Sequence, residues 1–496
     1  MKYKSTRSKT PVMYSSEAII KGIAEDGGLY VPLQLPTLDK SLEDLSTLDY
    51  KELAYIIMSR FLTDFSEKEL KNCIDDAYNE KFDTPLIAPL VEKAGVHFLE
   101  LYHGPTLAFK DMALSILPHL LKTSMKKQSI HQEVIILTAT SGDTGKAALE
   151  GFANVEGTKI MVFFPQDGVS NIQKLQMVTQ EGSNTFVSAI EGNFDDAQNA
   201  VKSIFNDKQL AEKLADKGYI LSSANSINIG RLIPQVVYYF YGYLTLRKEG
   251  KISKDESINV VVPTGNFGNI LAAFYAKKMG LPVGKLICAS NENNVLYDFI
   301  KTGIYDSKRA LHLTSSPSMD ILISSNLERL LYEISDTNEE LILDLMRRLS
   351  TEGIYEIPDT MKQRLNDFYG DYATEAEVFE AIKQLYETEG YIIDTHTAVA
   401  YSVYQKYRKH TGDTAPTIIA STASPFKFGK DVSKAIGLDI ADLDDFELLE
   451  KLADAAKVKL PAAVKELKTK PILHKSLAEK HEIKAVVENF LGGRTV

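Results

Sequence analysis

The stretch that decides the fold is Val134-Ile-Ile-Leu137 followed by Thr138-Ala-Thr-Ser-Gly-Asp-Thr-Gly-Lys146. The apolar, mostly β-branched run predicts a short buried strand, and the polar, glycine-containing run predicts a turn into a helix. Five similar apolar runs follow along the chain: Ile160–Phe164, Phe186–Ile190, Ile258–Val262, Leu286–Ala289 and Thr417–Ile419. Most are separated by stretches of helical periodicity, a pattern typical of a parallel sheet covered on both faces.

The apolar runs form two clusters, one on either side of the helical stretch Arg231–Leu246, and they predict an α/β protein with two parallel-sheet domains. We expect the smaller α/β domain over residues 126–244 and the larger one over residues 98–125 and 245–496. Residues 1–97 combine short helical stretches, such as Tyr50–Phe61, with a turn at Asp26–Gly28. They predict a mostly helical N-terminal domain.

The composition narrows the class of protein. The chain has 496 residues, 44% of them hydrophobic, and a net charge of −11, which argues against a general binder of nucleic acids or membrane surfaces. Two cysteines and nine scattered histidines form no disulfide framework and no metal motif, so we expect no metal. The chain has neither an apolar signal segment nor a run of about 20 apolar residues. We therefore expect a cytoplasmic protein.

Ligands of open parallel sheets bind beyond the carboxyl ends of the strands, so the loops there are the candidate sites. The Thr138–Lys146 loop carries hydroxyls and glycines at a helix start, which favours an anion or carboxylate cradle. A P-loop is excluded, because only two residues separate Gly142 from Gly145 and Ala147 follows the lysine. The alternative is an ordinary polar capping loop.

Two further loops have the same character. Pro263-Thr-Gly-Asn-Phe-Gly-Asn269 enters an alanine-rich helix, and its glycines allow close approach of a cofactor phosphate. It lacks the dinucleotide pattern Gly-x-Gly-x-x-Gly, and an ordinary strand-to-helix turn is the alternative. Asn225-Ser-Ile-Asn-Ile-Gly-Arg231 supplies amides and a guanidinium suited to a phosphate or carboxylate, with a purely structural arginine as the alternative.

One lysine has a distinctive setting. Lys110 ends the run His103-Gly-Pro-Thr-Leu-Ala-Phe-Lys and follows the mostly apolar stretch Pro105–Phe109. Desolvation lowers the pKa of a lysine, and the neutral amine is a nucleophile that can form a Schiff base with an aldehyde. The alternative is a lysine that reaches solvent at a helix start, beside Asp111.

Taken in order, eight segments of the chain resemble the threonine synthase family of pyridoxal 5'-phosphate enzymes, within the fold type II (tryptophan-synthase-β-like) group. The long extension before the lysine motif is similar to the branch found in bacteria and fungi. The segments are Glu25–Pro32, His103–Asp111, Thr140–Gly145, Asn225–Asn228 with Arg231, Gly265–Asn269, Ser318–Asp320, Asp394–Ala398 and Ser421–Pro425.

The resemblance implies a role for each loop. Lys110 forms the Schiff base with pyridoxal 5'-phosphate and acts as the mobile acid and base. The residues that look like the cradle of the cofactor phosphate are Gly265, Asn266, Phe267, Gly268 and Asn269. Thr422 matches the neutral hydroxyl partner of the pyridine nitrogen. The residues that match substrate-binding positions are Thr140, Ser141, Asp143 and Thr144 for the carboxylate and neighbouring cofactor groups, and Asn225 and Arg231 for the phosphate, with help from Ser141.

Two positions depart from the family pattern. Many relatives carry Asn where Asp143 stands, and an ionised carboxylate beside the cofactor phenolate is repulsive. Asp143 is therefore expected either to be protonated or to point elsewhere. Ser424 stands where family members often have His. The roles of both residues, and of Lys146, stay open.

The implied reaction converts O-phospho-L-homoserine and water to L-threonine and phosphate, by γ-elimination and then β-addition of water. The alternatives are a threonine or serine dehydratase and a lyase that releases 2-oxobutyrate from phosphohomoserine. From other classes, the missing glycine fingerprint argues against a nucleotide-binding oxidoreductase, and Lys110 against a non-catalytic regulatory relative. We expect a monomer or homodimer with a small-molecule substrate and no nucleic-acid or membrane partner.

Overall fold

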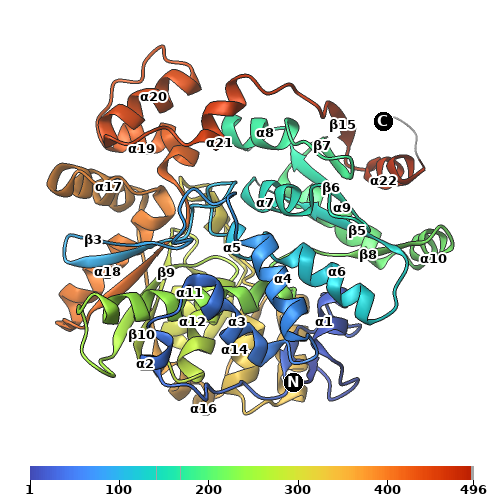
Figure 1. Ribbon diagram of the computed structural model, residues 1–496, viewed down its shortest axis with the longest axis horizontal. Helices are drawn as coiled ribbons and strands as arrows, with labels where there is room; N and C mark the ends of the chain where they lie inside the picture. Colours follow the sequence, from blue (N-terminus) through green and yellow to red (C-terminus); the bar gives the residue numbers. More distant parts are fainter. Residues whose placement is uncertain (141, 168, 493–496) are drawn as a thin grey trace.

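The computed structural model describes residues 1–140, 142–167 and 169–492. Two parallel sheets organise it, a five-stranded sheet at the upper right of Figure 1 and a six-stranded sheet at the lower left. None of the described helices is long and apolar enough to cross a membrane.

The five-stranded sheet has the order β15-β7-β6-β5-β8, and all of its strands are parallel. Its strands are β5 (Glu133–Ala139), β6 (Thr158–Pro165), β7 (Thr185–Glu191), β8 (Tyr219–Ser222) and β15 (Ser476–Glu479). The helices beside it are α7 (Asp143–Phe152), α8 (Asn171–Val178), α9 (Phe194–Asn206), α10 (Lys208–Asp216) and α22 (Ile483–Leu491).

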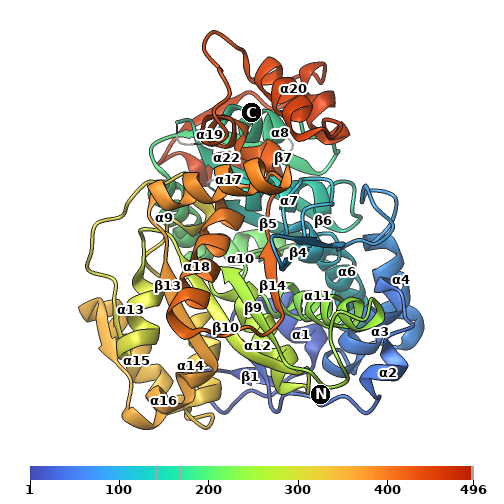
Figure 2. The same ribbon diagram turned by 90° about the vertical axis from the view of Figure 1, so that its left-hand side faces the viewer.

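The six-stranded sheet has the order β13-β10-β9-β14-β4-β3. Only β3, at one edge, is antiparallel to its neighbour. Its strands are β3 (Leu90–Lys93), β4 (Val96–Glu100), β9 (Ile258–Pro263), β10 (Val283–Ser290), β13 (Phe368–Tyr372) and β14 (Thr417–Ser421). Figure 2 shows β6 and β7 of the other sheet above β9 and β10.

Helices cover this sheet and extend the larger domain. They are α11 (Ile229–Lys248), α12 (Gly268–Lys278), α13 (Val295–Thr302), α14 (Leu327–Ile334), α15 (Glu339–Glu352), α16 (Asp359–Arg364), α17 (Glu375–Glu389), α18 (Thr395–Thr411), α19 (Gly429–Ala435), α20 (Asp445–Ala456) and α21 (Ala462–Lys465). A short antiparallel pair, β11 (Ile304–Asp306) and β12 (Ile354–Glu356), lies among them.

Both sheets are buried on both faces because successive side chains of a strand point to opposite sides. In β9, Val260 and Val262 join one apolar core, and Val261 joins another on the opposite face. In β5, Ile136 belongs to that first core, whereas Ile135 faces a third one under α9 and α22. The first core therefore includes residues of both sheets.

The N-terminal region contributes to this shared core. It contains β1 (Tyr3–Ser5), α1 (Ser15–Lys21), β2 (Tyr30–Pro32), α2 (Leu42–Leu45), α3 (Tyr50–Phe61) and α4 (Glu67–Ala77). Helix α3 packs on α11, and α1 and α4 pack on α6 (Leu117–Lys127). Its buried residues, such as Ile57, belong to the same core as Val260 of β9. The N-terminal region is thus helical, but it has no core of its own within the described residues.

The predicted elements can be compared with these bounds. All six predicted apolar runs are strands, and the expectation of two parallel-sheet α/β domains is confirmed. The predicted helix at Tyr50–Phe61 has the bounds of α3, and Arg231–Leu246 lies within α11. Between β7 and β8 the chain forms two helices, α9 and α10, and Asp207 caps α10 by accepting from the Leu210 N–H at 2.9 Å.

Two segments pair in a sheet that lies outside the predicted domain in which they begin. Strands β3 and β4 begin within residues 1–97 but pair in the six-stranded sheet. Strand β15, within residues 245–496, pairs with β7 in the five-stranded sheet, and Ile483 and Val487 of α22 enter the core beneath it. Residues 476–491 therefore lie with the smaller domain.

Replacing Ile483 with Ala tests this assignment. Ile483 is 1% exposed, and its truncation is expected to cost about 2–5 kcal/mol through lost burial and a cavity. We expect faster hydrogen exchange of the amides of β7 and β15, with β9 and β10 unchanged. Asn489→Ala, at an exposed position of the same helix, is the control. Faster exchange in the six-stranded sheet alone would contradict the assignment.

Candidate active site

Backbone pairing fixes the position of Lys110. Ala108 forms an isolated antiparallel bridge with Ala423, just beyond the carboxyl end of β14. The Phe109 N–H donates to the Thr422 carbonyl at 2.8 Å, and the Ser424 N–H donates to the Leu107 carbonyl at 3.0 Å. Lys110 then begins α5 (Asp111–Leu114). The lysine is therefore held beside the loop after β14, where its neighbour Thr422 is 5% exposed.

The turn before Lys110 explains the motif His103–Asp111. The carboxylate of Asp111 accepts from the Thr106 N–H at 2.8 Å and from the Thr106 hydroxyl at 2.6 Å. A Cβ on Gly104 would lie 2.5 Å from the Asp111 Cβ, so only glycine fits. Leu107 has a φ of 61°, which is costly for a side chain of this kind and is maintained by the surrounding contacts.

The Lys110 amine lies in a polar pocket with few exposed atoms. Its Nζ lies 3.2 Å from Ser318 Oγ and 3.6 Å from Asp143 Oδ2, and the side chain is 11% exposed. Burial lowers the pKa of Lys110; Asp143 opposes this, while the nearby cations Lys427 and Arg231 lower it further. The neutral amine expected from the sequence is consistent with this environment.

Asp143 faces Lys110, and its surroundings favour the ionised carboxylate over the protonated form that was one of the two alternatives expected from the sequence. Its Oδ1 lies 2.9 Å from Lys427 Nζ and accepts from Gln173 Nε2 at 2.9 Å. Burial disfavours the carboxylate, but Lys427 and Lys110 outweigh burial and hold the pKa of Asp143 well below its usual range. Lys427 therefore compensates the negative charge of Asp143, for which the sequence predicted no partner.

Lys427 was not predicted as a site residue. Its side chain is fully buried, and its Nζ also donates to the Thr106 carbonyl at 2.8 Å. The available signal was the run Pro425-Phe-Lys-Phe428, where apolar neighbours flank a lysine after a strand. Apolar neighbours of a lysine were also the reason why Lys110 was predicted as a site residue.

A second group absent from the prediction orients Ser318. His396 is 3% exposed, and its Nε2 accepts from the Ser318 N–H at 3.2 Å. The ring proton therefore lies on Nδ1, which is 2.8 Å from Asp394 Oδ2. Asp394 also caps α18 by accepting from the Thr397 N–H at 3.0 Å. Both segments belonged to the family resemblance, but no role followed from their composition.

The glycine loop after β9 is built to accept an anion. Within the described residues, none of the backbone N–H groups of residues 265–269 donates a hydrogen bond. A Cβ on Gly265 would lie 2.7 Å from the Ser318 carbonyl, and Phe267 has a φ of 64°. The amide Nδ2 of Asn269 is buried and has no partner among these residues. Free donors at a helix start fit a cofactor phosphate.

Arg231 supplies a buried cation near Lys110. It is 3% exposed, its NH1 donates to the Ala224 carbonyl at 2.9 Å, and its Nε has no partner among the described residues. No described carboxylate lies within ion-pair distance of it, and burial lowers its pKa to about 10. An unneutralised buried guanidinium favours a phosphate or carboxylate ligand. Asn225, in the preceding loop, is exposed.

The remaining predicted residues have different settings. The Thr140 hydroxyl accepts from the N–H groups of Gly142 at 3.0 Å and Gly145 at 2.9 Å, so it caps α7. Thr144 is half-buried, and Ser141 lies outside the described residues. Lys146 pairs with Glu150 at 3.0 Å, and the Ser424 hydroxyl accepts from the Phe426 N–H at 3.4 Å. These contacts of Lys146 and Ser424 are local, within four residues along the chain.

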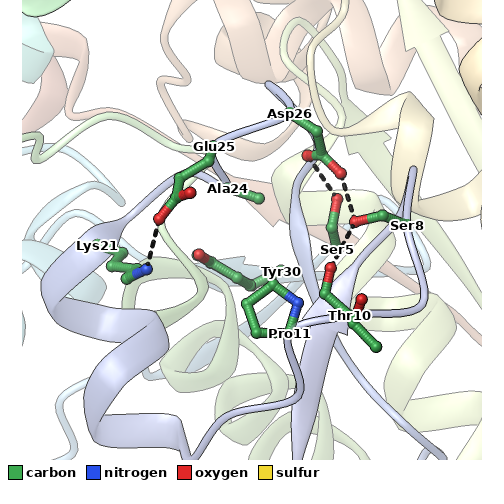
Figure 3. Close-up of a pocket in the computed structure, with 9 residues that line it drawn as sticks. All are labelled: Ser5, Ser8, Thr10, Pro11, Lys21, Ala24, Glu25, Asp26 and Tyr30. Atoms are coloured by element: carbon green, nitrogen blue, oxygen red, sulfur yellow. Dashed lines mark hydrogen bonds and ion pairs between the residues drawn. The ribbon is translucent and has the colours of Figure 1, made fainter.

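A surface hollow in the N-terminal region is a separate feature. It encloses about 130 Å³ and is lined by residues of β1, β2 and α1 (Figure 3). Its polar groups bind one another, since Asp26 accepts from Ser5 at 2.8 Å and Ser8 at 2.6 Å, and Lys21 pairs with Glu25 at 3.0 Å. None of the predicted site residues lines it.

Three family models match the chain in succession. They are described as "Threonine synthase N terminus" for residues 2–78, "Pyridoxal-phosphate dependent enzyme" for residues 79–363 and "Threonine synthase, C-terminal" for residues 397–487. The models cover the N-terminal region, the five-stranded sheet and every strand of the six-stranded sheet except β13.

Curated relatives agree with these models. The chain is 43% identical over 441 residues to human threonine synthase-like 1, covering 86% of this chain and 58% of the relative. It is 36% identical over 466 residues to threonine synthase of Schizosaccharomyces pombe, covering 88% and 89%, and 38% identical over 441 residues to that of Pseudomonas aeruginosa, covering 88% and 90%. The chain thus spans little more than half of the human relative.

Two solved structures are similar over nearly the full length. The PLP-bound threonine synthase of Brucella melitensis matches with a TM-score of 0.88 and 35% identity, covering 100% of both chains. The yeast threonine synthase matches with a TM-score of 0.88 and 34% identity, covering 99% of both chains.

The buried pair of Asp143 and Lys427 gives a pH-dependent prediction. Lys427→Met removes the closer of the two cations that face the buried Asp143 carboxylate and leaves only Lys110, at 3.6 Å, so it is expected to cost about 3–5 kcal/mol of unfolding free energy at pH 7. The folded-state pKa of Asp143 is depressed, so its contribution is present above the unfolded pKa of about 3.9 and is lost as the pH falls through the folded value. Urea unfolding should therefore show the cost shrinking below about pH 4.

The double variant Asp143→Asn with Lys427→Met is the matched control. It replaces both charges with neutral groups, so it should recover most of the stability lost in the single variant. A double variant as unstable as Lys427→Met at pH 7 would show that packing, and not charge, accounts for the loss.

Proposed function

The chain belongs to the threonine synthase family of pyridoxal-phosphate-dependent enzymes, and we propose that it converts O-phospho-L-homoserine and water to L-threonine and phosphate. The observation that carries this proposal is the unneutralised buried guanidinium of Arg231 near Lys110, in addition to the free N–H groups of the glycine loop. Two separate anion sites suit a substrate that brings a phosphate of its own.

The cofactor is held by groups already described. We assign its covalent attachment to Lys110, its phosphate to the N–H groups of Gly265, Asn266, Phe267, Gly268 and Asn269 with the Asn269 amide, and its pyridine nitrogen to the Thr422 hydroxyl. When bound, the cofactor supplies an electron sink that makes the α and β protons of the substrate acidic. A hydroxyl partner leaves the pyridine nitrogen neutral, so the cofactor withdraws electrons less strongly than it would with a carboxylate partner.

Lys110 carries protons in this assignment. Because its pKa is lowered, the Lys110 amine is suited to accept the α proton of the substrate and, once it has given that proton up, a β proton. The Ser318 hydroxyl and the Asp143 carboxylate, 3.2 and 3.6 Å from Nζ, hold the amine in the pocket. Lys427 stays paired with Asp143 and balances its charge.

The substrate binds between two loops. We assign its phosphate to Arg231 with Asn225 and Ser141, and its carboxylate to the start of α7, where Thr144 and the backbone offer donors. Thr140 supports that site by capping the helix. The departing phosphate stays close to the reacting carbons, where it is able to accept a proton from the attacking water.

The proposal extends to location and assembly. We propose a cytoplasmic enzyme that acts as a monomer or homodimer, in keeping with two free buried cysteines and a net charge of −11. A small-molecule substrate is its partner, and neither nucleic acid nor membrane is required. No cluster of metal-ligating residues occurs in the described part of the chain.

Product analysis from phosphohomoserine tests the function. The purified holoenzyme should release L-threonine and phosphate in equal amounts, and borohydride should fix the cofactor to Lys110. Release of phosphate with 2-oxobutyrate instead of threonine would identify the lyase alternative. Turnover of threonine or serine without turnover of phosphohomoserine would identify a dehydratase, which has no need for a second phosphate site.

Arg231→Ala tests the substrate-phosphate site. Losing a buried charged partner of a phosphate costs about 2–5 kcal/mol, so KM for phosphohomoserine should rise by roughly thirtyfold or more. The matched control is Arg247→Ala, at the other end of α11, where the guanidinium pairs with Glu43 at 2.6 Å. Its KM should stay unchanged. An unaltered KM in Arg231→Ala would refute the phosphate assignment.

A further inference from the structure

A second buried arginine lies behind the two phosphate-binding loops. Arg329, in α14, is 0% exposed, and its guanidinium donates to three oxygens from three separate segments. Nε donates to the Tyr30 carbonyl at 3.0 Å, NH1 to Asn326 Oδ1 at 2.5 Å and NH2 to the Ile227 carbonyl at 2.7 Å. The proposed function gives this residue no role.

Asn326 extends these contacts to both loops. Its Nδ2 donates to the Asn266 carbonyl at 3.1 Å and approaches Ser226 Oγ at 3.4 Å, and its own N–H donates to the Asn266 carbonyl at 3.1 Å. Asn266 belongs to the loop assigned to the cofactor phosphate, and Ser226 to the loop assigned to the substrate phosphate. One amide therefore connects the two loops, and Arg329 fixes the orientation of that amide.

The third acceptor anchors the arrangement to the N-terminal region. Tyr30 lies in the wall of the hollow in Figure 3, at the end of the turn that follows Asp26. Asp26 closes this turn by accepting from the Gly28 N–H at 2.8 Å and from Ser5 at 2.8 Å. The Tyr30 carbonyl therefore has a fixed position against which the guanidinium is held.

The charge of Arg329 is not neutralised at close range. The adjacent carboxylate, Glu328, is occupied by Arg7, whose NH2 lies 2.8 Å from it, and by the Thr6 hydroxyl at 2.5 Å. All three acceptors of Arg329 are neutral, and no described carboxylate lies within ion-pair distance of it. The guanidinium thus adds positive potential beside the loop of residues 225–228. Arg231 contacts the start of the same loop by donating to the Ala224 carbonyl.

We propose that Arg329 is a positioning residue that sets the separation of the substrate-phosphate loop (residues 225–228) and the cofactor-phosphate loop (residues 265–269), and thereby selects amino-acid substrates that carry a phosphate. This inference rests on the proposed function for the identity of the two anions. The planar guanidinium suits the task because its donors diverge in fixed directions, whereas a lysine ammonium does not span three such acceptors.

The main test compares Arg329→Lys and Arg329→Met with the unchanged holoenzyme. A displacement of about 1 Å can cost on the order of 100-fold, so we expect KM for phosphohomoserine and Kd for inorganic phosphate to rise roughly 10- to 100-fold. The Kd for L-threonine, which has no phosphate, should change little. Both variants should weaken binding of phosphohomoserine and phosphate but not of L-threonine. Lysine keeps the charge but loses the geometry, and methionine loses both.

Hydrogen exchange supplies a readout that does not depend on the reaction. Arg329→Met should speed exchange of the amides of residues 225–228 and 265–269 together, while β9 and β10 stay protected. Asn326→Ala, which leaves Arg329 in place, should loosen the same two loops. Arg364→Met on α16, which removes an exposed pair with Asp336, is the control and should alter neither loop.

Each outcome is decisive. Equal losses of affinity for phosphohomoserine and L-threonine, or faster exchange in only one loop, would overturn the positioning role. Failure of the unchanged enzyme to use phosphohomoserine would refute the proposed function, and exchange in the two loops would still decide whether Arg329 couples them.

Discussion

The ion pair between Asp143 and Lys427 is the interaction on which the site depends. Asp143 begins α7 beside the five-stranded sheet, and Lys427 follows β14 of the six-stranded sheet, so the pair joins the two domains at the point where Lys110 lies. Two buried charges are tolerated only when each compensates the other and their remaining donors and acceptors are hydrogen-bonded. Here Gln173 donates to Asp143, and Lys427 donates to the Thr106 carbonyl. The pair therefore links the two domains at the site and balances the charge around the reactive amine.

The sequence predicted those parts of the fold that local composition determines. Strands β5, β6, β9 and β10 were found because buried parallel strands are continuous apolar runs. Strand β15 was missed, because its four residues include only one that is buried and its conformation depends on the free edge of β7. Pairing between segments so far apart in the chain leaves no local pattern, and the same holds for the edge strands β8 and β13.

In the candidate site, too, features of local composition were predictable and contacts between distant segments were not. Loops that follow strands were predictable from glycines, hydroxyls and charged residues, and they surround Lys110 in the structure. The contacts between loops were not predictable: Lys427 reaches Asp143, and His396 reaches Ser318, across long separations in sequence. Thr140 illustrates a different difficulty, because a hydroxyl near a helix start can act as a cap, as a ligand or as both, and its hydrogen bonds to Gly142 and Gly145 establish the capping role alone.

The C-terminal strand β15 has a consequence for biosynthesis. Strands β5 to β8 leave the ribosome long before β15, and four of the six strands of the larger sheet, β9, β10, β13 and β14, are made in between. Until then the nascent smaller domain has β7 as a bare edge, with backbone donors and acceptors open to other chains. The order of synthesis therefore makes this sheet the last to be completed, and the edge of β7 stays open until the final segment of the chain pairs with it.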